Sequence, residues 1–157
     1  MDSDHSTLYI KRAWNEILLA KAIFRLSNEG RLKSMFELKE DTTFYSNVIS
    51  NAYYCIFYSA KSLLYIKDVI TEPPEEHKKT LEAFERIVAS GEVDVDLLRV
   101  YKSVAVKADE LLGIFRREKK KRGEFTYQKL PQANYEPAKE SLENAEKFFK
   151  NINMIML

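Results

Sequence analysis

The sequence predicts an all-α protein, an antiparallel, up-and-down bundle of five to six helices. Three observations carry this prediction. The stretch 44–67 contains no glycine and no proline and, wound as a helix, is apolar around most of its circumference. The whole chain of 157 residues holds only four glycines and four prolines, which leaves little material for tight turns. Apolar residues recur three and four positions apart in the other long segments, and no internal repeat is present.

The stretch 44–67 is expected to be the central helix, packed on several sides. Beside its apolar sector runs a separate stripe of amphipathic residues: Asn51, Tyr54, Tyr58, Lys61 and Tyr65. Two interpretations of this stripe stay open. Its tyrosine rings cover the core and send their hydroxyls to water or to a neighbouring polar group. Alternatively, the stripe forms an interface with another subunit or a partner protein, where tyrosine is enriched.

Two helices are expected before the central helix. The first covers about 6–28, and Gly30 is a plausible stop at its C-terminal end. Its buried face is predicted to hold Ile10, Ala13, Trp14, Ile17 and Phe24. A short second helix is expected over 31–40, and the polar residues 41–43 offer N-caps for the central helix.

Three more helices are expected after the central one. Two prolines at 73–74 suit a first helical turn, so a helix is predicted to start there. Asp94 or Asp96 caps the next helix, whose apolar seam covers 97–115. The last helix opens near 136–137, again with a proline in its first turn.

Length and composition limit the class of protein. A chain of this length suits one domain covering residues 1–157. Hydrophobic residues make up 45% and charged residues 31%, which is typical of a globular protein and not of a disordered one. The net charge is only +1, so affinity for nucleic acid or a membrane must come from a local patch.

The same composition argues against several kinds of site. No apolar run reaches membrane-spanning length and no signal-peptide pattern opens the chain, so we expect a cytoplasmic protein. The single Cys55 and the two histidines, His5 and His77, are far apart in sequence, which argues against a zinc site. No glycine-rich phosphate loop is present. We therefore expect no metal and no cofactor.

The strongest local charge is a basic run at 116–122, interrupted by a single acid, Glu118. It has two interpretations. It is a patch that binds RNA or phosphate, or it is a set of cations at the end of the preceding helix, which the helix dipole favours without any ligand. On the first interpretation, the nucleotide- or RNA-binding face comprises Arg117, Lys120, Lys121, Arg122 and Tyr127.

Three motifs occur together in order along the chain. The central helix reads NAYYCIFY from Asn51 to Tyr58, and a leucine pair follows it. His77 comes next, and the sequence RGEFTY from Arg122 to Tyr127 precedes a last helix with an Ala/Leu/Ala/Phe stripe. This order resembles the HEPN family (higher eukaryotes and prokaryotes nucleotide-binding), in the branch whose central helix reads AYYAxF. The resemblance covers nearly the whole chain.

The resemblance implies a four- or five-helix up-and-down bundle that is commonly dimeric. Prokaryotic members are often toxins or toxin partners, encoded beside a small nucleotidyltransferase that acts as antitoxin. Active members are metal-independent ribonucleases whose signature is an arginine, four to six further residues and a histidine. The histidine can exchange a proton with the attacking 2′-hydroxyl or the leaving oxygen. The arginine can stabilise the negative charge that develops on the phosphorane.

This chain departs from that signature. Residues 70–72, where an arginine paired with His77 would stand, are isoleucine, threonine and glutamate. At the place matching the signature stand Arg122 and, five residues later, Tyr127 instead of a histidine. The phenol of a tyrosine has an ordinary pKa near 10, so Tyr127 is a poor general base at neutral pH. The candidate catalytic residues are therefore Arg122, Tyr127 and His77. His77 itself is expected to be a solvated or capping residue in a first helical turn.

The preferred interpretation is a catalytically degenerate, homodimeric HEPN-like protein that binds a nucleotide, RNA or a partner. It would form one half of a nucleotidyltransferase-linked, toxin–antitoxin-like pair. One alternative is a ribonuclease that uses Arg122 and Tyr127, with or without His77. The other is a purely structural interaction module. A small nucleotidyltransferase gene next door would favour the first interpretation, and its absence would favour the last.

Overall fold

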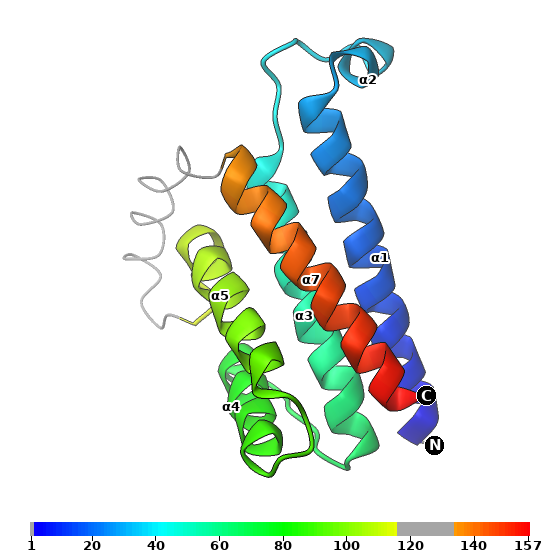
Figure 1. The fold of residues 1–157 in the computed structure, drawn as a ribbon, viewed down its shortest axis with the longest axis vertical. Coiled ribbons are helices and arrows are strands. Elements are labelled where there is room, and N and C mark those ends of the chain that lie inside the picture. The colour runs from blue at the N-terminus through cyan, green and yellow to red at the C-terminus, as the bar shows by residue number, and fades with distance from the viewer. Residues whose placement is uncertain (1, 116–133) are drawn as a thin grey trace.

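The computed structural model describes residues 2–115 and 134–157, and every regular element in those ranges is a helix (Figure 1). The helices are α1 (Asp2–Asn28), α2 (Gly30–Met35), α3 (Tyr45–Ile66), α4 (Glu76–Ala89), α5 (Val95–Leu112) and α7 (Tyr135–Met156). The prediction of an all-α protein is therefore confirmed.

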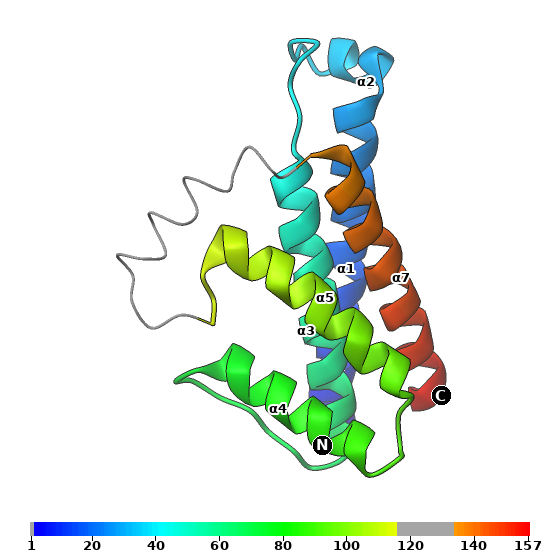
Figure 2. The same cartoon turned by 60° about the vertical axis from the view of Figure 1, so that its left-hand side comes forward.

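The long helices alternate in direction. α1 runs opposite to α3 and α7, so the described N- and C-terminal segments lie at the same end of the bundle (Figure 1). α5 runs back on the other side of α3. α4 and α5 cross the long helices at an angle, and the two diverge toward the start of α4 and the end of α5 (Figure 2).

α3 is the centre of the bundle and contacts α1, α4, α5 and α7. Its observed bounds lie just inside the predicted stretch 44–67. The hydrophobic residues of α3 with no exposed surface come from most of its circumference: Val48, Ala52, Tyr53, Cys55, Ile56 and Ala60. Burying a large apolar side chain contributes about 1.5–3 kcal/mol, so α3 supplies a large part of the stability of the core.

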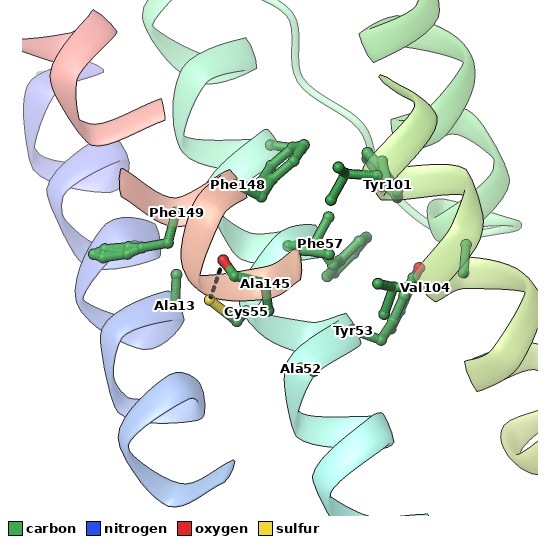
Figure 3. Packing of buried hydrophobic residues seen from close by; sticks show 14 of the residues in the cluster. Ala13, Ala52, Tyr53, Cys55, Phe57, Tyr101, Val104, Ala145, Phe148 and Phe149 are labelled. Atoms are coloured by element: carbon green, nitrogen blue, oxygen red, sulfur yellow. Dashed lines mark hydrogen bonds between the residues drawn. The ribbon is translucent and has the colours of Figure 1, made fainter. Parts of the chain in front are cut away.

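Fully buried small residues mark the places where the helices approach each other closely. Ala13 of α1, Ala52 of α3 and Ala145 of α7 have no exposed surface, and they lie together near the middle of the bundle (Figure 3). The Sγ atom of Cys55 is 4.0 Å from the carbonyl oxygen of Ala145. Cys55 therefore serves as a small buried side chain, as free cysteines commonly do.

Trp14 departs from its predicted burial, because 49% of its surface is exposed. The buried face of α1 is centred on Ala13, Ile17 and Ala20. Trp14 lies at the edge of that face, where its ring meets the ring of Phe149 edge-on at 5.5 Å. The periodicity of one helix predicts its apolar side, but the limits of that side depend on where the neighbouring helix lies.

Two helix starts also differ from the prediction. Gly30 opens α2 instead of ending the first helix, and α2 is shorter than the predicted segment 31–40. α4 begins at Glu76 and not at the prolines 73–74, because Glu75 adopts a left-handed conformation with φ of 56° that separates them from the helix.

The ends of α5 follow the sequence signals. The carboxylate of Asp94 accepts a hydrogen bond of 2.9 Å from the backbone N–H of Asp96, so Asp94 is the N-cap. Gly113 ends the helix in the left-handed conformation, with φ of 64°. None of the described helices combines the length and the hydropathy that crossing a membrane would require.

Candidate functional site

The imidazole of His77, in the first turn of α4, lies against the middle of α3. Its Nδ1 is 2.8 Å from the hydroxyl oxygen of Tyr53. Its ring stacks on Phe57, with centroids 4.3 Å apart and 30° between the planes. The rings of Tyr54 and Phe115 approach it edge-on at 5.9 and 6.2 Å. His77 is thus half-buried in an aromatic box formed by these four rings, and the expectation of a solvated or capping residue is wrong.

Burial decides where the protons of this pair lie. Tyr53 has no exposed surface, and burial raises the pKa of its hydroxyl far above the usual value, so the hydroxyl keeps its proton. Within the described residues His77 Nδ1 is its hydrogen-bond partner, and the hydroxyl therefore donates to Nδ1. Neutral His77 then carries its own proton on Nε2. Burial also lowers the pKa of His77 below 6.5, which favours the neutral form at pH 7.

The ammonium group of Lys61 lies beside the same box. It is 5.6 Å from the ring centre of Phe57 and 4.9 Å from that of Tyr9. It forms an ion pair with the carboxylate of Glu76 and donates a hydrogen bond of 3.0 Å to the carbonyl oxygen of Thr71. Lys61 is only 7% exposed. Its charge is compensated within the chain, so Lys61 adds no open cation to the stripe predicted on α3.

The tyrosines of that stripe share a partly exposed surface with α1. We call it the tyrosine face, and it consists of Tyr9, Arg12, Tyr54, Tyr58 and Tyr65. The rings of Tyr9 and Tyr58 are 6.3 Å apart and nearly parallel, as are those of Tyr54 and Tyr58 at 6.1 Å. The guanidinium of Arg12 lies 4.2 Å from the ring centre of Tyr58 and donates a hydrogen bond of 2.7 Å to its hydroxyl. Tyrosine and arginine are both enriched in protein interfaces.

Polar contacts fix the border of the tyrosine face. The side-chain amide of Asn51 donates a hydrogen bond of 2.6 Å to the carboxylate of Glu16. Burial raises the pKa of Tyr54 and of Tyr58; Arg12 opposes this effect at Tyr58, and Glu16 adds to it at both. Both hydroxyls are therefore neutral at physiological pH and serve as hydrogen-bonding groups.

The remaining predicted site residues are not placed by the structure. Arg117, Lys120, Lys121, Arg122 and Tyr127 lie outside the described residues. In residues 2–115 and 134–157, no three His, Cys, Asp or Glu side chains come together in a way that could hold a metal ion.

Sequence reasoning missed Tyr53, Phe57 and Phe115 of the aromatic box, and Tyr9 and Arg12 of the tyrosine face. From the sequence, Tyr53 is only one member of the mostly apolar stretch 44–67, and Arg12 lies off the predicted buried face of the first helix. The tyrosine pair in the motif NAYYCIFY was a usable signal for Tyr53, because a buried tyrosine needs a partner for its hydroxyl. Nothing in the sequence near Arg12 pointed to Tyr58.

A model of the HEPN domain family matches residues 27–155, a range that includes the whole aromatic box around His77. The chain belongs to the HEPN domain family. No curated protein and no solved structure gives a significant match. Membership of the HEPN family indicates a nucleotide- or RNA-related function in general, and HEPN domains often form dimers.

Proposed function

We propose that this HEPN protein binds RNA, a nucleotide or a partner protein, and does not cleave RNA by the arginine–histidine chemistry of the family's ribonucleases. It acts as one half of a pair with a small nucleotidyltransferase, in the manner of a toxin–antitoxin system. The observation that carries the catalytic half of this proposal is the hydrogen bond between the buried hydroxyl of Tyr53 and Nδ1 of His77, and the binding half is supported by membership of the HEPN family.

This hydrogen bond counts against His77 as a general base. A general base needs an unprotonated atom within hydrogen-bonding reach of the 2′-hydroxyl, about 3 Å. In His77 the unprotonated Nδ1 is occupied by Tyr53, and Nε2 already carries a proton. Turning the imidazole out of the box would leave a fully buried hydroxyl without a partner, which costs about 1–3 kcal/mol.

The distribution of arginines supports the same proposal. No arginine stands at 70–72, where the family signature would place one before His77. In the described part of the chain, the guanidinium of Arg12 is held by Tyr58 on the tyrosine face. The charge-stabilising partner that RNA cleavage requires is therefore missing from the signature position.

Cleavage of a labelled RNA by purified protein tests the catalytic half of the proposal. We expect the wild type to show no cleavage, or cleavage orders of magnitude below that of a HEPN ribonuclease with an intact signature. The variants His77→Ala and Arg122→Ala should be indistinguishable from it. Robust cleavage by the wild type that is lost in Arg122→Ala would overturn the proposal, and a parallel loss in His77→Ala would identify His77 as the base.

Binding of single-stranded RNA tests the other half. If the basic run contacts phosphates, affinity should fall steeply as salt rises, in proportion to the number of contacts. Reversing the charges of Lys120, Lys121 and Arg122 should abolish binding. Affinity that is absent at low salt, or unchanged by the reversal, would leave only the helix-capping interpretation of these cations.

The gene next to this one, and co-purification of its product, test the proposed nucleotidyltransferase partner. We expect a small nucleotidyltransferase to be encoded beside this gene and to co-purify with the HEPN protein when the two are expressed together. A neighbouring nucleotidyltransferase that does not associate with the chain would argue against the pairing.

A further inference from the structure

A mostly apolar groove lies between α4 and α5, next to the aromatic box but separate from the tyrosine face. Its volume is about 320 Å³, within the range of small-molecule sites. We call it the α4–α5 groove, and it is lined by Leu81, Lys102, Ala105, Val106, Asp109 and Phe115. Its lining residues come from α4, from α5 and from the segment just after α5.

The two ends of the groove carry opposite charges. Lys102 and Asp109 are seven residues apart on α5, so they lie on the same side of the helix, two turns or about 10 Å from each other. Lys102 forms a long ion pair with Glu85, in which Nζ is 3.6 Å from Oε2, and both side chains are exposed. Such an exposed pair adds little stability, so a stronger anion can replace Glu85 as the partner of Lys102.

An aromatic ring is fixed at the Asp109 end. The carboxylate of Asp109 accepts a hydrogen bond of 3.0 Å from the backbone N–H of Phe115. The ring of Phe115 is further held edge-on against Tyr53 at 6.3 Å and against His77 at 6.2 Å. The groove therefore presents a positioned aromatic ring beside a carboxylate, an apolar floor, and an ammonium group two helical turns away.

We infer that the α4–α5 groove binds a nucleoside monophosphate whose base carries an amino group, an inference that rests on the nucleotide-related function proposed above. The base packs against Phe115, since bases stack readily on aromatic side chains. Its amino group donates to the carboxylate of Asp109, as exocyclic amino groups do to acidic side chains. The phosphate meets Lys102. The base and the phosphate lie at opposite ends of such a ligand, as Asp109 and Lys102 lie two helical turns apart along the groove.

Titration calorimetry of the full chain with three ligands tests this inference. AMP supplies both the amino group and the phosphate, IMP replaces the amino group with an oxygen, and adenosine lacks the phosphate. We expect AMP to bind at one site per chain, about tenfold more tightly than IMP or adenosine, which is the ratio that one charged hydrogen bond typically gives. Equal affinity for the three ligands, or no saturable binding, would overturn the inference.

Substitutions in the groove assign the site. Val106 is 62% exposed, so Val106→Trp fills the groove without disturbing the core and should weaken AMP binding at least tenfold. Lys102→Glu should erase the preference for AMP over adenosine. Asp109→Asn keeps an oxygen that can accept from the N–H of Phe115, and it should erase the preference for AMP over IMP. Arg99→Glu, a charge reversal one turn away and outside the groove, is the matched control and should bind AMP like the wild type.

The outcomes separate this site from the RNA-binding proposal. If the wild type binds RNA but not AMP, the groove inference fails alone. If AMP binds and Val106→Trp blocks it while RNA binding is absent, the groove stands and the RNA role falls. If Val106→Trp leaves AMP binding intact but disrupts self-association, the groove belongs to an interface between copies and the inference is overturned. Matching melting temperatures show that each variant is folded.

Discussion

Two tyrosines at the centre of the bundle, Tyr53 and Tyr101, are both fully buried, but their hydroxyls differ. The hydroxyl of Tyr53 donates to His77, whereas within the described residues that of Tyr101 makes no hydrogen bond of good geometry and has only the hydroxyl of Tyr53 nearby. A buried polar atom without a partner costs free energy, and a paired one contributes a modest net stabilisation. The same substitution at the two positions should therefore have different effects.

We expect Tyr53→Phe to lower the free energy of unfolding by about 1 kcal/mol, because it removes a buried hydrogen bond. Tyr101→Phe should cost less than this or be stabilising, because it removes a buried hydroxyl that makes no hydrogen bond of good geometry. Urea unfolding at neutral pH measures both changes. Equal destabilisation by the two variants would contradict the assignment of His77 as the partner of Tyr53 alone.

His77 predicts how stability depends on pH. Burial lowers the pKa of its imidazole below the ordinary 6.5, so the unfolded chain takes up a proton at a higher pH than the folded chain does. The free energy of unfolding should therefore be greatest above pH 6.5 and should decrease as the pH falls from there through the lower pKa of the folded state. His77→Gln does not titrate in this range. The difference between wild type and His77→Gln should thus shrink on acidification, and a constant difference would contradict the prediction.

At the scale of elements, the first turn of α4 makes two polar contacts with α3. The buried ion pair of Lys61 and Glu76 lies there, next to the hydrogen bond of His77. A second ion pair, between Lys67 and Glu92, joins the end of α3 to the segment after α4 but is much more exposed. The two pairs have the same chemistry and differ in burial, so they form a matched comparison.

Glu76→Gln should lower the free energy of unfolding by about 3 kcal/mol, because it leaves a buried ammonium group without a counter-charge. Glu92→Gln should have little effect, because exposed ion pairs contribute little. Urea unfolding gives the stabilities, and faster amide hydrogen exchange at the start of α4 would locate the change. Similar losses in the two variants would show that burial does not set the strength of the Lys61 pair.

The sequence predicted the elements well because helix periodicity is a local property. The predicted helix 44–67 agrees with the observed bounds of α3 to within one residue at each end. Pro137 correctly indicated the first turn of α7, and Asp94 the start of α5. The sequence could not predict which side chains of different helices meet. His77 was expected to be a solvated or capping residue because nothing within its own helix shows that Tyr53, in another helix, needs an acceptor. Trp14 was expected in the core for the same reason: its burial depends on the position of α7.

For the candidate site, the sequence predicted which residues share one face of α3 but not which residues of other helices they contact. Tyr54 and Tyr58 could be grouped on one stripe from helical spacing alone. Lys61 shares that spacing, but its ammonium group turns to Glu76, a contact that depends on how the chain returns after α3. Arg12 joins the tyrosines only because α1 packs against α3. Periodicity therefore gives the face of a helix, and packing decides what that face contains.

At the scale of the whole molecule, two exposed surfaces could receive a second copy of the chain. One is the tyrosine face, with four tyrosines around Arg12. The other is the outer side of α1, where Trp14, Leu18 and Leu19 are each 44–50% exposed. Tyrosine and arginine at the centre of an interface commonly account for most of its binding energy. We therefore expect the tyrosine face to be the dimer interface.

The chain of 18.4 kDa should behave as a dimer in light scattering at tens of micromolar protein. Arg12→Glu should convert it to a monomer, because loss of a central arginine typically costs about 2 kcal/mol or more of binding free energy and the new carboxylate lies near Glu16. Arg12 is exposed, so the fold should be retained, as melting curves can verify. Leu18→Glu is the control on the outer side of α1 and should remain dimeric. A monomeric wild type would refute the assembly, and a monomeric Leu18→Glu with a dimeric Arg12→Glu would move the interface to the outer side of α1.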